Sequence, residues 1–122
     1  MKTWLLIAAI LGALAVLCGA FAAHGLRARL SPDARAIFET AARYHMYHAL
    51  AMGLAAFARR GEAAARARLA AFLFLAGILL FSGSLYLLAL TANTAFGYVT
   101  PIGGLCFIVG WVFLALAALR LP

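Results

Sequence analysis

Residues 38–58 read FETAARYHMYHALAMGLAAFA, and this stretch decides how the rest of the chain is arranged. It is long and apolar enough to cross a membrane as a helix, which takes about 20 residues. Unlike the three other long apolar runs, it also carries full charges and two histidines: Glu39, Arg43, His45 and His48. Polar groups inside a hydrocarbon layer must be paired within the protein. We therefore expect the other three runs to surround this helix.

The composition of the chain points to the same class of protein. Of its 122 residues, 68% are hydrophobic and only 11% are charged, and the mean hydropathy is +1.07. A water-soluble domain of this size cannot bury that much apolar surface, whereas lipid accepts it without cost. We predict an all-α integral membrane protein, an antiparallel four-helix bundle that forms one transmembrane domain over residues 1–122. Its helices are expected at residues 3–26, 32–58, 66–91 and 101–119.

Local signals support these helix boundaries. Ser31, Pro32 and Asp33 form a strong helix start, because serine caps, proline fits the first turn and an acid favours the positive end of the helix dipole. Residues 3–26 also resemble a secretory signal with a small-residue cleavage site at residues 20–22. We favour a retained first helix, because the apolar stretch is longer than a usual signal core.

The net charge is +7, and most of the basic residues that produce it lie at the ends of the apolar runs. With the N-terminus in the cytoplasm, that side would carry six basic residues against three opposite, which agrees with the positive-inside rule. We therefore expect a multi-pass protein of the cell (inner) membrane with both termini cytoplasmic and membrane lipid as its surroundings. No basic face interleaved with aromatics follows a phosphate backbone, so nucleic acid is excluded as a partner. A homo-oligomer or a membrane-protein partner stays open. The six basic residues on the expected cytoplasmic side are Lys2, Arg59, Arg60, Arg66, Arg68 and Arg120. The three on the opposite side are Arg27, Arg29 and Arg35.

Small residues recur seven apart in each expected span, which favours left-handed helix crossings with close backbone approach. The glycines carry this argument, because alanine is so common that some of its spacings arise by chance. They are Gly12 and Gly19 in the first span, Gly77 in the third, and Gly103 and Gly110 in the fourth.

Polar side chains gather in the non-cytoplasmic half of the expected bundle, while the cytoplasmic half is almost purely apolar. One interpretation is a hydrogen-bonded polar cluster that sets helix register in a structural or interaction protein. The other is a one-sided pocket for a small ligand or lipid headgroup, or a transport or proton-handling site around His48. The candidate residues are His24, Glu39, Thr40, Arg43, Tyr44, His48, Ser82, Ser84 and Tyr86.

Catalytic and cofactor sites are not favoured by the spacing of these residues. His45 and His48 supply only two metal ligands, and no acid near mid-span completes a shell. A haem held by His24 and His48 would need both at one depth, and His24 lies farther out. Ser82 or Ser84 with His48 lacks an acid partner at its level. We expect no metal, no cofactor and no enzyme activity, and the two cysteines, both inside apolar runs, are expected to be unpaired packing residues.

Four motifs in order resemble a known family. They are GAFAAHGL at residues 19–26, F-x-T-A-x-x-Y followed by HAL within residues 38–50, FSGSLY at residues 81–86, and TPIGG followed by GW within residues 100–111. Together they are similar to the YgdD-type small membrane proteins, a domain of unknown function with bacterial inner-membrane and eukaryotic members. The resemblance covers nearly the whole chain and implies a four-span membrane protein, but it implies no activity. The residues that it carries over are His24, Thr40, Tyr44, His48, Ser82, Ser84, Tyr86, Pro101 and Trp111.

Overall fold

A computed structural model describes all of residues 1–122, and every regular element in it is helical. Two short 3-10 turns and one π-helical segment, η2, accompany the α-helices. The elements in chain order are α1 (Lys2–Ala23), α2 (Pro32–Phe57), η1 (Gly61–Ala63), α3 (Ala64–Gly77), η2 (Ile78–Ser82), α4 (Gly83–Thr91), η3 (Thr94–Tyr98) and α5 (Thr100–Ala118).

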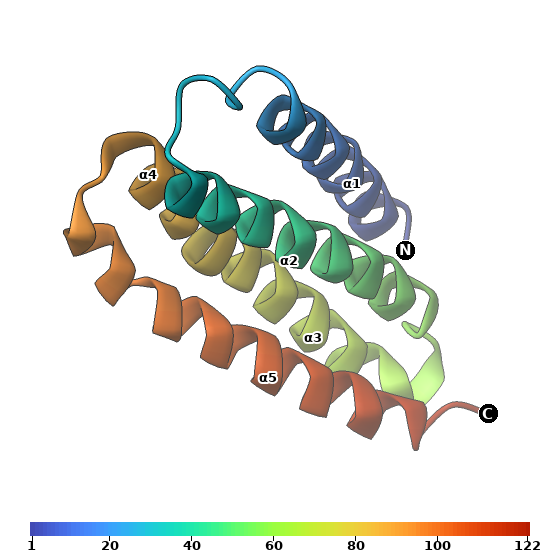
Figure 1. The fold of residues 1–122 in the computed structure, drawn as a ribbon. Coiled ribbons are helices and arrows are strands. Elements are labelled where there is room, and N and C mark those ends of the chain that lie inside the picture. Colours follow the sequence, from blue (N-terminus) through green and yellow to red (C-terminus); the bar gives the residue numbers. More distant parts are fainter.

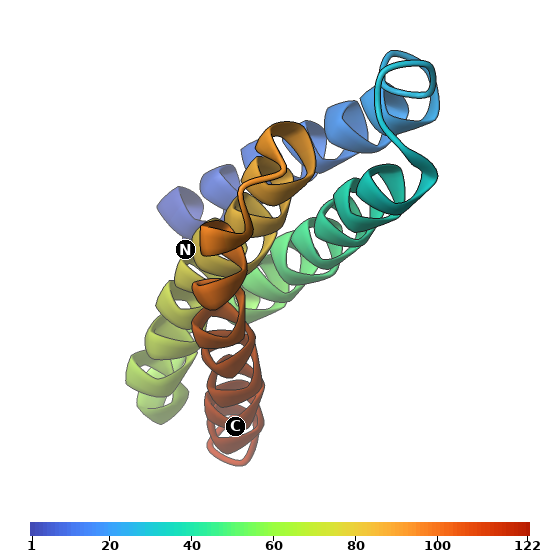
Figure 2. The same ribbon diagram turned by 60° about the vertical axis from the view of Figure 1, so that its left-hand side comes forward.

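The helices form four antiparallel rods, because α3, η2 and α4 run on as one continuous rod (Figure 1). This rod and α2 pack against each other at the centre. α1 packs mainly on α2, and α5 packs on α3 and η2, so α1 and α5 lie on opposite sides of the central pair. Figure 2 shows α2 and α5 inclined to each other. The predicted all-α antiparallel bundle of four helices is confirmed.

Three of the rods have the length and composition needed to cross a membrane: Lys2–Ala23, Gly61–Thr91 and Thr94–Ala118. Their outer surfaces expose large apolar side chains such as Leu17 and Leu79, as a lipid-facing surface does. The fourth rod, α2, is more polar, since it carries Arg43 and two histidines. It packs on α1 and on the α3–α4 rod, whereas α5 packs on α3 and η2. Two of the three other rods therefore cover α2, and the expectation that all three surround it is met only in part.

The ends of the first two helices follow from local chemistry. α1 ends at Ala23, three residues before the expected end. A Cβ at Gly25 would lie 2.5 Å from the ring of Phe21, so glycine lets the chain fold back closely here. At the start of α2, the Ser31 hydroxyl accepts a hydrogen bond from the Ala34 N–H at 3.2 Å, which confirms the predicted cap.

The third rod differs from the uninterrupted helix expected over residues 66–91. It begins earlier, with the 3-10 turn η1 leading into Ala64, and the π-helical segment interrupts it at Ile78–Ser82. In that segment the Gly83 N–H bonds to the Ile78 carbonyl, five residues back instead of four. Such a segment adds a residue to the turn and re-aims the side chains on it, and it is frequent at functional sites.

Glycine contacts hold α5 tightly against the third rod, as predicted. A Cβ at Gly103 would collide with the backbone of η2 at Leu80 and Phe81, and one at Gly110 would lie 2.8 Å from the Phe74 ring. The same prediction is wrong for α1, because a Cβ at Gly19 would meet nothing within 4 Å. The first helix has its buried small residues at Ala8, Ala15 and Ala22 and packs on α2 without using Gly19.

Candidate functional site

His48 lies on the face of α2 that looks toward α5, and both of its ring nitrogens are hydrogen-bonded. The indole N–H of Trp111 donates to Nε2 at 3.1 Å, and Nδ1 lies 2.7 Å from the Tyr44 carbonyl. An indole nitrogen can only donate, so Nε2 accepts and the proton sits on Nδ1. The two contacts therefore define a neutral ring with a single tautomer, and the ring is only 5% exposed.

An aromatic stack from α5 and α3 covers the imidazole of His48. Its ring and that of Phe107 are nearly parallel, at 7°, with centroids 3.4 Å apart. Phe107 can come this close because its own ring lies against Gly77, where a Cβ would collide with it. Phe74 and Trp111 close the stack from the side, with their ring centroids 5.2 Å apart. The glycine contact on α3 thus positions the ring that covers His48.

Beside this stack lies a crevice of about 540 Å³ between α2 and α5, which we call the α2–α5 crevice. Its walls are mainly aromatic, and no residue with a full charge lines it. Tyr44 and Tyr47 contribute the hydroxyls, and neither hydroxyl has a hydrogen-bond partner in the protein, unlike that of Tyr86. The eight lining residues are Tyr44, Tyr47, His48, Phe81, Gly104, Phe107, Ile108 and Trp111.

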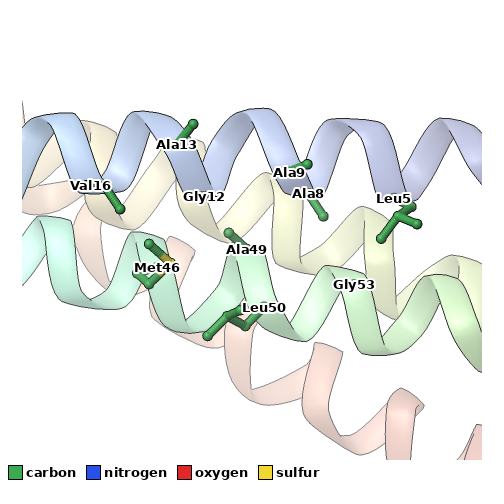
Figure 3. A pocket seen from close by; sticks show the side chains of 10 residues that line it. All are labelled: Leu5, Ala8, Ala9, Gly12, Ala13, Val16, Met46, Ala49, Leu50 and Gly53. Carbon is green, nitrogen blue, oxygen red and sulfur yellow. The ribbon is translucent and has the colours of Figure 1, made fainter.

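A second hollow of about 290 Å³ lies between α1 and α2, and it is lined almost entirely by small and aliphatic side chains (Figure 3). Ala8, Gly12, Ala49 and Gly53 lie along it. It holds no aromatic ring and no polar side chain, so it differs in chemistry from the α2–α5 crevice.

The other histidine of the central stretch, His45, lies three residues before His48 on α2 and contacts α4 instead of α5. Nδ1 of His45 lies 2.9 Å from the Tyr86 hydroxyl on α4, and its Nε2 is buried without a partner. His45 is 5% exposed, like His48. The two histidines therefore join α2 to different neighbours and do not form a pair.

The two serines of the candidate set bind backbone carbonyls. Ser82, which is fully buried, donates to the Ala41 carbonyl of α2 at 2.8 Å. Ser84 donates to the Phe81 carbonyl of its own rod at 2.9 Å and lies 2.6 Å from the Thr100 hydroxyl of α5. Each serine is thus engaged in joining or shaping helices, and neither lies beside a histidine in a hydrogen bond.

The remaining candidates lie toward the surface near the start of α2 and the end of α1. Arg43 donates to the Thr40 hydroxyl at 3.2 Å, and Glu39 pairs with Arg35 at 3.8 Å. Arg43 therefore does not extend the Arg35–Glu39 pair along the helix. His24 is exposed and follows the last residue of α1. None of these side chains forms a hydrogen bond with His45 or His48.

The structure thus brings together only part of the predicted polar cluster. Tyr44 and His48 lie together at the α2–α5 crevice, and Tyr86, Ser82 and Ser84 bind elsewhere, while His24, Glu39, Thr40 and Arg43 lie outside. Residues that the candidate set lacks complete the crevice. Phe107 and Trp111 are four residues apart on one helix, so their spacing predicts that they share a helix face. Nothing in the sequence indicated that this face meets His48. Phe81 reaches the crevice from the π-helical segment, which no simple spacing predicts.

The fold and the apolar outer surface define the class: a small helical bundle suited to a lipid membrane. The chain belongs to the family described as "Protein of unknown function (DUF423)", whose model matches residues 18–104. That span covers the end of α1, all of α2 to α4 and the start of α5.

Relatives of nearly the same length are named as membrane proteins. UPF0382 membrane protein YwdK of Bacillus subtilis (strain 168) is 40% identical over 121 residues, covering 98% of both chains. UPF0382 membrane protein SERP0230 of Staphylococcus epidermidis is 42% identical over 120 residues, again covering 98% of both. A UPF0382 membrane protein of Haemophilus influenzae is 41% identical over 118 residues, covering 96% of this chain and 94% of the relative. No solved structure matches the chain. The predicted class, a helical membrane protein from a family of unknown function, is confirmed.

Proposed function

We propose that the protein is a membrane-embedded binding protein without enzyme activity, and that its site is the α2–α5 crevice. The observation that carries the proposal is a hollow of about 540 Å³ with aromatic walls and two tyrosine hydroxyls that no protein group satisfies. Ligand sites are typically apolar hollows of this order with a few polar groups that set orientation. Tyr44 and Tyr47 are 39% and 52% exposed, so their hydroxyls are open to a bound molecule with an oxygen atom, which would give them the hydrogen bonds that an apolar layer does not.

Catalysis is not supported by the hydrogen bonds of the buried polar groups. Ser82 and Ser84 donate to backbone carbonyls, so neither hydroxyl is activated by a base. The Nε2 of His48 is already occupied by the Trp111 N–H. A nucleophile needs an adjacent base with a free acceptor nitrogen, and the crevice offers none.

The same bonds count against a proton-handling role for His48. A second proton on the ring would have to sit on Nε2, where it would face the indole N–H of Trp111. Protonation therefore requires that this bond break and that a charge form beneath the ring of Phe107. A neutral ligand suits the crevice better than a charged headgroup, since no cation lines it.

A purely structural bundle is the rival function, and it has its own support. The bonds of His45 with Tyr86 and of Ser82 with Ala41 both join α2 to the third rod, as register-setting contacts would. These bonds lie outside the crevice, however, so they explain the buried polar residues without explaining Tyr44 and Tyr47. The two functions can be separated by filling the crevice.

The test uses fluorescence energy transfer from Trp111 to dansyl-labelled undecanol in lipid nanodiscs. The chain has two tryptophans, so Trp4→Phe leaves Trp111 as the sole donor at the crevice wall. A bound probe gives transfer that saturates with probe concentration, whereas probe dissolved in the lipid gives a rise without saturation. We expect a saturating component, and its absence would refute the binding function.

Gly104→Leu provides the crevice-filling variant. A Cβ at Gly104 meets only the Phe81 ring, at 3.8 Å, which is ordinary contact, so the backbone can accept the change. The matched control is Gly53→Leu, which fills the hollow between α1 and α2 (Figure 3) and where a Cβ meets nothing within 4 Å. We expect Gly104→Leu to abolish the saturating transfer and Gly53→Leu to keep it. Circular dichroism checks that both variants fold, and the smaller Gly104→Ala should weaken transfer partially.

We also propose that the protein resides in the cell membrane with both termini in the cytoplasm. Support comes from the end of the bundle where Arg120 pairs with Glu62 at 3.5 Å, since this end holds both termini (Figure 1) and six of the ten basic residues.

The narrower affiliation with YgdD-type proteins is likewise a proposal, supported by the four motifs. Association with a second copy or another membrane protein stays a prediction.

A further inference from the structure

We infer that the α2–α5 crevice binds a neutral, flat-ringed, lipid-soluble molecule that carries carbonyl oxygens, of the quinone type. This inference rests on the proposed binding function and names the class of ligand. Three features of the crevice carry it: the shape of its walls, the chemistry of its two free hydroxyls and its lack of charge.

The walls of the crevice present ring faces and edges from two helices and the π-helical segment. The rings of Tyr44 and Phe81 lie 4.9 Å apart, and those of Phe81 and Phe107 lie 5.4 Å apart. Aromatic rings attract each other at centroid separations of about 4.5–7 Å in offset or edge-on geometry. A flat ring entering the crevice can therefore make the same contacts, which a single flexible acyl chain makes less well.

The two hydroxyls supply hydrogen bonds to such a ring. Tyr44 and Tyr47 lie next to each other, with ring centroids 5.6 Å apart, and both line the crevice. A phenol O–H donates to a carbonyl oxygen, and neither hydroxyl has a protein acceptor. The other polar groups at the crevice are already occupied: the Trp111 N–H by His48, and Nδ1 of His48 by the Tyr44 carbonyl. The tyrosine hydroxyls are thus the groups left to recognise an oxygen of the ligand.

The charge of the lining excludes an anionic ligand such as a phosphate headgroup. None of the eight lining residues carries a full charge, and both nitrogens of His48 are engaged as a neutral ring. Arg43 is the nearest cation along α2, and its guanidinium donates to Thr40, one turn toward the start of the helix. Burying an anion without a partner is costly, so the ligand is neutral.

The test compares two molecules that share one skeleton, menadione and methylnaphthalene, which differ in the two carbonyl oxygens. Each competes with dansyl-labelled undecanol for the Trp4→Phe protein in nanodiscs, and the readout is loss of the saturating transfer. We expect menadione to compete at lower concentration than methylnaphthalene. Tyr44→Phe and Tyr47→Phe should each weaken menadione by roughly three- to tenfold, the worth of one hydrogen bond, and should leave methylnaphthalene unchanged.

The possible results separate the ligand class from the binding function. If both molecules compete equally and the tyrosine variants change neither, the crevice binds apolar rings without recognising oxygen, and the quinone-type inference is overturned while binding stands. If the undecanol probe saturates but neither ring competes, the ligand is a chain and the inference also fails. If no saturating transfer exists in the parent protein, the proposed function falls as well. Tyr98→Phe, an exposed tyrosine outside the crevice, serves as the matched control and should change nothing.

Discussion

Trp111 donates its indole hydrogen to Nε2 of His48 at 3.1 Å, and this bond joins α5 to α2. These two helices pack mainly on the rod between them, so the bond spans a gap that the backbones leave open. It also fixes the tautomer of His48 and places the indole ring at the edge of the α2–α5 crevice. A single side-chain pair thus connects the stability of the bundle with the shape of its candidate site.

The first prediction concerns the energy of this pair. Trp111→Phe removes the donor and leaves a buried acceptor unpaired, so we expect a loss of about 1 kcal/mol in the free energy of unfolding. His48→Phe keeps a ring beneath Phe107 but removes both nitrogens. A double-mutant cycle, measured by unfolding in sodium dodecyl sulfate mixed micelles, should give a coupling energy of about 0.6–1.7 kcal/mol, the range for hydrogen bonds between membrane helices. A coupling of zero would mean that the bond does not form in the membrane.

The second prediction concerns Ser82, whose hydroxyl donates across helices to the Ala41 carbonyl at 2.8 Å. Ser82→Ala should cost about 0.6–1.7 kcal/mol in the same unfolding measurement, because the side chain is fully buried and no water replaces the bond. The control is Thr91→Ala, whose exposed hydroxyl bonds only to its own chain segment: it donates to the Leu87 carbonyl at 2.6 Å and accepts from the Asn93 N–H at 3.2 Å. We expect that change to cost less than Ser82→Ala, because water or lipid headgroups reach the exposed groups that it frees. Equal losses for both variants would contradict a register-setting role for Ser82.

The third prediction tests the glycine contacts that seat α5. Gly103→Ala would drive a Cβ into the backbone of η2 at Leu80 and Phe81, so α5 must move, and we expect a loss of about 1–3 kcal/mol or more. The same change at Gly19 meets nothing within 4 Å and should stabilise α1 by up to about 1 kcal/mol, since alanine favours helix. Because Phe107 and Trp111 move with α5, Gly103→Ala should also weaken saturating energy transfer from Trp111. An alanine at residue 103 without effect on unfolding would show that α5 is not seated on these contacts.

The helices were predictable because composition and apolar run length act through local chemistry that needs no tertiary information. The Ser31 cap and the close approach at Gly103 and Gly110 followed from the same kind of signal. The π-helical segment was not predictable, because it depends on how the third rod fits α2 and α5 at once. The sequence also predicted one polar cluster, whereas in the structure His45 contacts Tyr86 on α4 and His48 contacts Trp111 on α5.

The candidate site was predictable in its centre and not in its walls. Tyr44 and His48 were selected because polar side chains one helical turn apart in an apolar stretch demand partners. The partner of His48 is Trp111 on α5, 63 residues away, and no local spacing indicates which face of α5 turns toward α2. The exposed candidates His24 and Arg43 were selected for depth along the helix, but depth does not determine the direction in which a side chain points.

The last prediction concerns the orientation of the bundle in the membrane. The η1 end holds both chain termini, and the η3 end lies at the opposite side of the molecule (Figure 1). Basic residues favour the cytoplasmic side, and most of them lie at the η1 end. In a chain with Cys18→Ser and Cys106→Ser, we therefore expect a membrane-impermeant maleimide added to intact cells to label Thr94→Cys and not Arg60→Cys. Both positions are exposed, Arg60 between α2 and η1 and Thr94 at the start of η3, so permeabilised cells should label both and provide the control. Labelling of Arg60→Cys alone in intact cells would show that the orientation is the opposite one. The basic residues before and at the start of α2 would then be the ones that determine the orientation.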